Sequence, residues 1–230
     1  MIPDLNQVQI RVLGCLIEKQ LTTPDYYPLT LSALTNACNQ KSNRDPVMSL
    51  TESDVMDAIQ GLISLNMGRE QQMAGARSLK YAHKLSGTLT KEFDCSQNEL
   101  GVLSVLFVRG PQTVGEIRTR TARMCNFESL ADVEATLNSL REKSSGPFVM
   151  AMAREPGRRE IRHQHLFSTA PVEEQAAATE QLPNQTSSQT ASQAIGAQTN
   201  TKALDELREE VSSLRADLDS LTDIVNQLLK

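Results

Sequence analysis

The sequence predicts an α+β fold, mainly α-helical, with two tandem winged-helix domains, a disordered linker and a C-terminal coiled-coil helix. Three observations support this prediction. Short patterns occur twice within the first 167 residues, the composition changes at Ser168, and apolar residues near the C-terminus recur with a 3.5-residue period. The predicted boundaries are 1–90 and 93–167 for the winged-helix domains, 168–201 for the linker and 202–230 for the coiled coil.

An internal repeat is the main evidence for two similar domains. PLTLSAL at 28–34 and PQTVGEI at 111–117 share a Pro, a Thr two residues later and apolar residues at matching positions. Further along, TESDVMDAIQGL at 51–62 matches SLADVEATLNSL at 129–140. A recurring series of short elements indicates a duplicated structural unit.

The second pair of repeat segments begins with the pattern of a helix N-terminus. Thr51 and Ser129 are each followed three residues later by an Asp. The hydroxyl and the carboxylate of such a pair can bond the free amide groups of the first helical turn. Similar pairs, Asp4 with Gln7 and Ser96 with Glu99, predict earlier helices that end near Lys19 and Arg109.

Alternating apolar and polar residues after each third helix predict a β-hairpin. Residues 79–85 and 161–167 alternate with period two, which is typical of strands. Residues 67–73 and 148–154 supply the partner strands, and the Pro-Gly pair of EPGR suits a type II turn. Three helices followed by a hairpin are the winged form of the helix-turn-helix.

The tail has a different composition from the rest of the chain. Residues 168–201 are rich in Gln, Ser, Thr and Ala without an apolar period, so we predict a disordered linker. Apolar residues then alternate spacings of three and four over four heptads, the pattern of a coiled-coil seam. We predict homodimerisation through this seam; the alternative is an amphipathic helix that packs on its own chain or on another protein. The seam residues are Leu204, Leu207, Val211, Leu214, Leu218, Leu221, Val225 and Leu228.

Composition predicts a cytoplasmic protein without membrane contact. The four cysteines are far apart, no CxxC pair occurs, and no apolar signal segment precedes them. No run approaches the ~18 apolar residues that a membrane span requires. Aromatic residues make up only 3% of the chain and Trp is absent, so the cores must consist of Leu, Val, Ile, Met and Ala.

The predicted third helices carry the wrong charge for reading DNA bases. Residues 51–66 contain three acidic residues and no Lys or Arg, and Asp132 and Glu134 open the corresponding helix of the second domain. Helices that read the major groove use Arg, Lys, Asn and Gln. Major-groove readout is therefore disfavoured in both domains.

Positive charge gathers elsewhere in the second domain. The net charge of −5 is concentrated in the tail, where residues 168–230 carry ten acidic and four basic side chains. Arginines on or near the second helix and around the hairpin are predicted to contact the phosphates or the minor groove of double-stranded DNA. The alternative is pairing with neighbours such as Glu116, Glu155 and Glu160. The arginines are Arg118, Arg120, Arg123, Arg154, Arg158, Arg159 and Arg162.

The connection between the second and third helices of the first domain reads CNQKSNRDP. Asn and Pro suit a turn, whereas Lys41 and Arg44 are not required by one and join the candidate DNA contacts. For Arg44 the alternative is a local ion pair with Asp45.

These segments also resemble a known family. CLIEKQLTTPDYYPLTLSALTNACNQKSNRDPVM at 15–48, ARM at 122–124 and GPFVMAMAREPGRRE at 146–160 are similar to the bacterial YceH-like family of uncharacterised proteins. The resemblance spans roughly residues 5–168. It implies a tandem winged-helix fold and supplies no activity or catalytic residues that could be carried over to this chain.

No pattern indicates catalysis, a metal site or a cofactor. His163 and His165 share one face of a strand, which we interpret as a packed pair, and Cys15 and Cys38 lie on apolar helix stripes. No paired carboxylates, phosphate loop or Ser-His-Asp pattern occurs, so we predict a protein without enzyme activity. Two functions remain open. One is a dimeric DNA-binding, regulatory protein that contacts backbone or minor groove through the second domain; the other is a scaffold whose acidic third helices bind a basic protein partner without DNA.

Overall fold

The computed structural model describes residues 2–72, 78–86, 93–154, 157 and 160–168. The described part is α+β, with six α-helices and two three-stranded antiparallel sheets. None of the helices in these ranges is long and apolar enough to cross a lipid bilayer. The predicted coiled coil and all of the predicted linker except Ser168 lie outside the described residues, as do Arg158 and Arg159.

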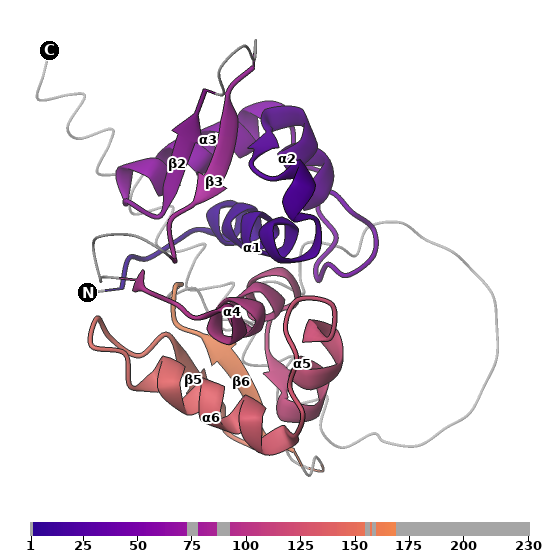
Figure 1. The fold of residues 1–230 in the computed structure, drawn as a ribbon, viewed down its shortest axis with the longest axis vertical. Coiled ribbons are helices and arrows are strands. Elements are labelled where there is room, and N and C mark those ends of the chain that lie inside the picture. The colour runs from indigo at the N-terminus through magenta and orange to yellow at the C-terminus, as the bar shows by residue number, and fades with distance from the viewer. Residues whose placement is uncertain (1, 73–77, 87–92, 155–156, 158–159, 169–230) are drawn as a thin grey trace, which may run out of the picture. The chain divides into compact units, whose positions relative to one another are not determined.

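Both halves of the described chain have the same order of α-helices and strands. The first half contains α1 (Gln7–Thr22), η1 (Pro24–Tyr26), β1 (Leu29–Thr30), α2 (Leu31–Cys38), α3 (Glu52–Ser64), β2 (Gly68–Gln71) and β3 (Lys80–His83). The second half contains α4 (Gln97–Arg109), β4 (Gln112–Thr113), α5 (Val114–Thr121), α6 (Leu130–Arg141), β5 (Val149–Ala151) and β6 (Arg162–His165). The sheets are ordered β1-β3-β2 and β4-β6-β5 (Figure 1). The repeat found in the sequence thus corresponds to a repeated series of helices and strands.

Each sheet contains one strand that the sequence analysis did not predict. β1 and β4 are two residues long and pair antiparallel with β3 and β6. They lie inside the PLTLSAL and PQTVGEI repeats, immediately before α2 and α5. Two residues are too few to show a period-two pattern, so only the paired strand reveals them.

Helix N-termini follow the predicted chemistry with one correction. The boxes Thr51–Asp54, Ser96–Glu99 and Ser129–Asp132 form with both reciprocal hydrogen bonds. The predicted start at Asp4 is wrong, because Asn6 caps α1 and pairs with Gln9. Asn and Asp side chains cap helices almost equally well, so the sequence alone did not decide between a start at Asp4 and a start at Asn6.

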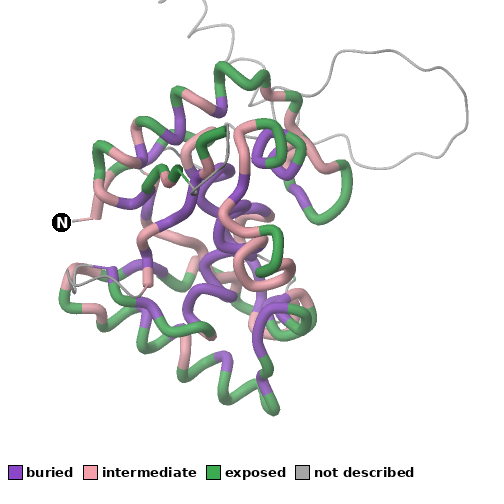
Figure 2. The backbone as a smooth tube through the Cα atoms, turned by 45° about the horizontal axis from the view of Figure 1, so that its top comes forward, coloured by how far each residue is buried: buried purple, intermediate pink, exposed green. Residues whose placement is uncertain are grey.

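The two halves pack along α1 and α4, which lie side by side (Figure 1). Their buried apolar side chains form one continuous cluster, and Figure 2 shows the buried residues in the middle of the described part. Gly14 permits this close approach, since a Cβ there would lie 2.7 Å from Phe107 Cβ and 2.8 Å from Val108 Cγ1. Ser104 Oγ also donates to the Gly14 carbonyl at 3.3 Å. The described residues of both halves accordingly belong to one compact unit.

The CNQKSNRDP segment attaches the first half to the second. The Asp45 amide donates to the Val108 carbonyl at 2.8 Å, and Arg109 donates to Asn43 Oδ1. Asn43 itself has φ = 60°, a left-handed conformation that Asn tolerates better than most residues. The loop therefore does more than connect α2 to α3, because it docks on α4.

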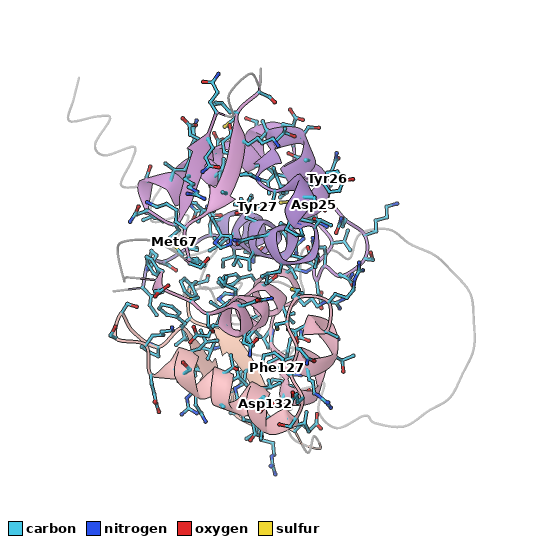
Figure 3. The ribbon with its side chains drawn as sticks, viewed as in Figure 1. Asp25, Tyr26, Tyr27, Met67, Phe127 and Asp132 are labelled. Carbon is cyan, nitrogen blue, oxygen red and sulfur yellow. The ribbon has the colours of Figure 1, made fainter. Side chains whose placement is uncertain are left out.

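Tyr27 and His83 connect the loop before α2 to the hairpin of the first half. The His83 amide donates to Tyr27 Oη at 2.8 Å, and the two rings are 6.1 Å apart. Tyr27 is partly buried against the core, whereas the neighbouring Tyr26 is 76% exposed (Figure 3). The His83 ring also bonds Gln20, so these contacts join the hairpin of the first half to α1.

Candidate functional site

A cleft of about 730 Å³ opens where the docked loop of the first half faces the second half. Its sides are the end of α1, residues 40–43, the C-terminal turn of α4 and the end of α5. We call it the cationic cleft because five basic side chains line it: Lys19, Lys41, Arg109, Arg120 and Arg123.

Little negative charge offsets these cations. Glu18 is the one carboxylate in the cleft lining, and it is bonded to Arg44. Arg120 pairs loosely with Glu116 at 3.5 Å, and both side chains are 30% exposed, so this pair contributes little. Among the described residues, no ion pair involves Lys19, Lys41 or Arg123. The cleft therefore holds an excess of positive charge.

The positive charge of the cleft affects the ionisation of Arg109. Partial burial, and then the positive charges of Arg120 and Arg44, lower the pKa of Arg109. Its guanidinium is held in place by Asn43 Oδ1, a neutral acceptor from the other half. Because a neutral acceptor leaves the charge uncompensated, an anion in the cleft would relieve the repulsion between these guanidinium groups.

The structure brings together candidates that are distant in sequence. Lys41 from the first half and Arg120 and Arg123 from the second line the same cleft. Sequence reasoning missed Lys19 and Arg109, which appeared only as helix ends. Their signal, a cation in the last turn of α1 and of α4, also has an ordinary explanation in the helix dipole.

The other predicted arginines are scattered. Arg118 ties α5 to the following loop by donating to the Phe127 and Glu128 carbonyls. Arg162 donates to the Pro111 carbonyl at 2.7 Å and lies 3.5 Å from Glu116 Oε2. It lines a second hollow of about 320 Å³ that shares Arg109 and Arg120 with the cationic cleft. Asp45 and Glu116 also line this hollow, so Arg162 lies in surroundings of mixed charge.

Arg44 is not a surface contact, which corrects the prediction made for it. Its side chain is 0% exposed and pairs with Glu18 Oε2 at 2.5 Å. It also donates to the Ala37 carbonyl at 3.0 Å. The predicted alternative, an ion pair with Asp45, is wrong as well, because the sequence neighbour Asp45 instead faces solvent. A buried, paired guanidinium cannot reach a phosphate group.

The exposed faces of α3 and α6 are acidic, as their sequences indicate. Glu52, Asp54 and Asp57 are exposed on α3, and Asp132 and Glu134 are exposed on α6. Figure 3 shows Asp132 and Phe127 near the start of α6. These faces disfavour contact with phosphate groups.

A second, apolar groove of about 540 Å³ lies between α6 and the β5–β6 hairpin. Leu130 and Ile161 line it and are 49% and 41% exposed. Arg154, another predicted contact, lies at this groove with Glu160 and His163. Arg154 is thus on a different surface from Lys41 and Arg123.

The histidines of the second hairpin lie in different surroundings. His165 packs edge-on against Phe107 with ring centroids 5.0 Å apart, and burial lowers its pKa to about 4. Burial, and then the charge of Arg141, lower the pKa of His163. The described residues contain no group of three or more His, Cys, Asp or Glu side chains arranged to hold a metal ion.

The chain is similar to bacterial proteins over most of its length. The family model described as "Protein of unknown function, DUF480" matches residues 5–158. A UPF0502 protein of Aliivibrio salmonicida is 42% identical over 224 residues, which are 97% of this chain and 98% of that one. A UPF0502 protein of Vibrio cholerae is 47% identical over 164 residues, 71% of this chain and 76% of its own length. The longer alignment necessarily includes much of the C-terminal tail.

Proposed function

We propose that this chain, which belongs to the DUF480 family of proteins of unknown function, is a tandem winged-helix protein that binds the phosphate backbone of double-stranded DNA through the cationic cleft. Its membership confirms the resemblance to uncharacterised bacterial proteins found in the sequence. Each half has three helices, a hairpin and a short third strand before the second helix, an order that supports the winged-helix assignment.

The observation that carries the proposal is the gathering of five cations from both halves. Phosphate contacts depend on Lys and Arg that neutralise charge and release counterions. Lys41 and Arg123 are exposed and unpaired among the described residues, so they are the strongest candidates. Base readout is not part of the proposal, because the exposed faces of α3 and α6 are acidic.

Dimerisation and location complete the proposal. We propose that the heptads between Leu204 and Leu228 pair two copies of the chain in the bacterial cytoplasm, where the four free cysteines remain reduced. Two linked clefts would bind one DNA molecule more tightly than one cleft does. We propose that the protein acts without enzyme activity and without a cofactor.

The decisive experiment measures affinity for a labelled duplex against salt concentration. We expect log Kd to rise linearly with log salt between ~50 and ~200 mM, and the double variant Lys41→Ala, Arg123→Ala to reduce that slope by about 2. The matched control is Arg69→Ala with Arg141→Ala, which removes the same charge from exposed positions outside the cleft. Equal slopes for the two variants would contradict the assignment of the cleft, and no binding at low salt would contradict DNA binding.

The apolar groove favours a second candidate function, a protein-interaction scaffold. Leu130 and Ile161 would accept an apolar side chain of a partner, and the acidic face of α6 beside them suits a basic partner. Affinity capture with the full chain and with Ile161→Asp tests this candidate. A partner that the variant loses and that the cleft variant keeps would favour the scaffold.

A further inference from the structure

The five cations of the cationic cleft differ in how easily a partner can reach them. Lys41 and Arg123 are exposed, whereas Lys19, Arg109 and Arg120 are partly buried. A large partner that stays outside the cleft can neutralise the two exposed cations, but a ligand must enter the cleft to contact the other three as well. The cleft therefore offers more positive charge to a small anion than to a duplex.

The size of the cleft also favours a small ligand. Its volume of about 730 Å³ is within the range of sites that bind small molecules, about 300–1,000 Å³. A DNA duplex carries its phosphate groups on a convex surface, so only the groups nearest the cleft can touch its cations. A linear chain of linked phosphate groups is thin enough to enter the cleft, and it brings several anionic groups to one place.

Apolar side chains strengthen the electrostatic field inside the cleft. Val105, Val108 and Met124 line it and are 1%, 2% and 9% exposed. Walls of low dielectric constant between charges of one sign concentrate the field and raise the local concentration of counter-ions. An anion bound against these side chains is therefore attracted more strongly than an anion in open solvent.

The end of α1 presents little uncompensated negative charge to an anion. Carbonyl groups in the last turn of a helix lack intrahelical partners and carry partial negative charge. Here Thr22 Oγ1 donates to the Glu18 carbonyl at 2.7 Å, and Thr23 Oγ1 donates to the Lys19 carbonyl at 3.2 Å. The Glu18 carboxylate is bonded to Arg44. These negative groups are thus already paired.

Contacts between the two halves hold the cations in place before a ligand binds. Arg109 donates to Asn43 Oδ1, and the Asp45 amide donates to the Val108 carbonyl at 2.8 Å, so the loop that contains Lys41 is fixed on α4. Preorganised groups lose less conformational entropy on binding. Guanidinium groups also donate to phosphate oxygens in parallel pairs, which adds both strength and geometric selectivity.

We propose that the cationic cleft binds a linear oligophosphate, the chemistry that nucleoside triphosphates and inorganic polyphosphate share. The ligand contacts the partly buried Lys19, Arg109 and Arg120 together with the exposed Lys41 and Arg123. Its binding excludes DNA phosphate groups from the same cations, so the oligophosphate regulates the cleft. This competition rests on the proposed function, whereas oligophosphate binding itself does not.

Isothermal titration calorimetry of the full chain without DNA tests the binding. The titrants are tripolyphosphate, ATP, inorganic phosphate and adenosine, each at ~50 mM salt and matched ionic strength. We expect tripolyphosphate and ATP to bind at least about tenfold more tightly than inorganic phosphate, because they neutralise more cations. Absent binding of both, or binding of inorganic phosphate or adenosine with equal affinity, would overturn the proposal.

The ratio of two affinities identifies the source of the phosphate chain. Tighter binding of ATP than of tripolyphosphate would support a nucleotide as the ligand, since the nucleoside then adds contacts. Equal or tighter binding of tripolyphosphate would support the phosphate chain alone.

Variants of the partly buried cations locate the ligand. Lys19→Ala with Arg120→Ala should weaken tripolyphosphate binding about a hundredfold, because two charged hydrogen bonds are lost. The control Arg69→Ala with Arg141→Ala removes the same charge outside the cleft and should keep the affinity within about threefold of the wild type. Circular dichroism checks the folds, and Lys19→Gln alone, with an expected loss of about tenfold, replaces a double variant that fails to fold. Equal affinities of the cleft and control variants would overturn the proposal.

Displacement of a labelled duplex tests the competition. Tripolyphosphate should release DNA at concentrations near its own Kd, whereas NaCl at the same ionic strength should release less. Tripolyphosphate binding without DNA binding would contradict the proposed function and support the oligophosphate site. DNA binding without tripolyphosphate binding would overturn the oligophosphate site and support the proposed function. Binding of both without displacement would overturn the competition.

Discussion

Arg44 and Glu18 form a buried ion pair with Nη2 and Oε2 2.5 Å apart, and it joins the loop after α2 to α1. The Arg44 side chain is 0% exposed and that of Glu18 is 11% exposed. Two parallel contacts, from Nη1 at 3.3 Å and Nη2, make the pair bidentate. The ion pair therefore fixes the loop after α2. In this loop Lys41 lines the cationic cleft and Asn43 accepts a hydrogen bond from Arg109.

Removing one partner of this pair should strongly destabilise the protein. We expect Arg44→Ala to lower the free energy of unfolding by roughly 3–5 kcal/mol, because Glu18 would remain buried without compensation. Urea denaturation followed by circular dichroism measures the change. Lys41→Ala, in the same loop but exposed, should change the free energy by less than about 0.5 kcal/mol. Similar effects of the two variants would contradict a structural role for Arg44.

The contact between α1 and α4 should tolerate no side chain at residue 14. A Cβ on Gly14 would meet Phe107 and Val108 below 3.0 Å, so Gly14→Ala should cost about 1–3 kcal/mol despite the better helix propensity of Ala. Gly115 in α5 is the matched control, since a Cβ there meets nothing within 4 Å. Gly115→Ala should stabilise by about 0.4–1 kcal/mol. Thermal unfolding measures the change in stability of both variants. Stabilisation by Gly14→Ala would contradict close packing of α1 on α4.

Acid should destabilise the first half through His83. Nδ1 of this side chain accepts from the Leu85 amide at 3.1 Å, and Nε2 donates to Gln20 Oε1, so the folded state holds the neutral ring. Burial, and then the charge of Arg69, lower the pKa of His83 to about 4. In the unfolded chain the pKa is about 6.5, so between these values the unfolded state binds more protons.

The expected sign is a stability contribution that is fully present above pH ~6.5 and lost as the pH falls toward 4. The loss from His83 alone should reach roughly 2–3 kcal/mol. His83→Asn keeps an acceptor near the Leu85 amide and cannot gain the proton. Urea denaturation at pH 7 and near pH 4.5 should therefore show a smaller drop for the variant, and equal drops would place the acid sensitivity elsewhere.

Paired charges on the predicted seam should separate the proposed dimer. Leu214→Glu with Leu221→Glu places two carboxylates at d positions, whereas Ser212→Glu with Ser220→Glu adds the same charge at positions outside the a and d sites. Analytical ultracentrifugation of the full chain should give a dimer for the wild type and the serine variant and a monomer for the leucine variant. A wild-type monomer would disprove dimerisation through the tail.

Much of the local structure followed from local chemistry. Thr51 and Ser129 mark helix starts because a hydroxyl followed by a carboxylate three residues later bonds the first amide groups, wherever the helix packs. The hairpins around β3 and β6 followed from period-two alternation in the same way. The misplaced start of α1 shows the limit of this reasoning, since Asp4 and Asn6 are similar caps two residues apart.

By itself, the sequence determined the α+β class, the repeated order of helices and hairpins, and the family, because each depends on neighbours along the chain. Only the tertiary structure decided which cations share a surface. Lys41 and Arg123 are 82 residues apart and meet at one cleft, while Arg44, three residues from Lys41, is buried against Glu18. The physical reason is that the interaction energy of two charges depends on their distance in space and on their burial. The packing of α1 on α4 sets both.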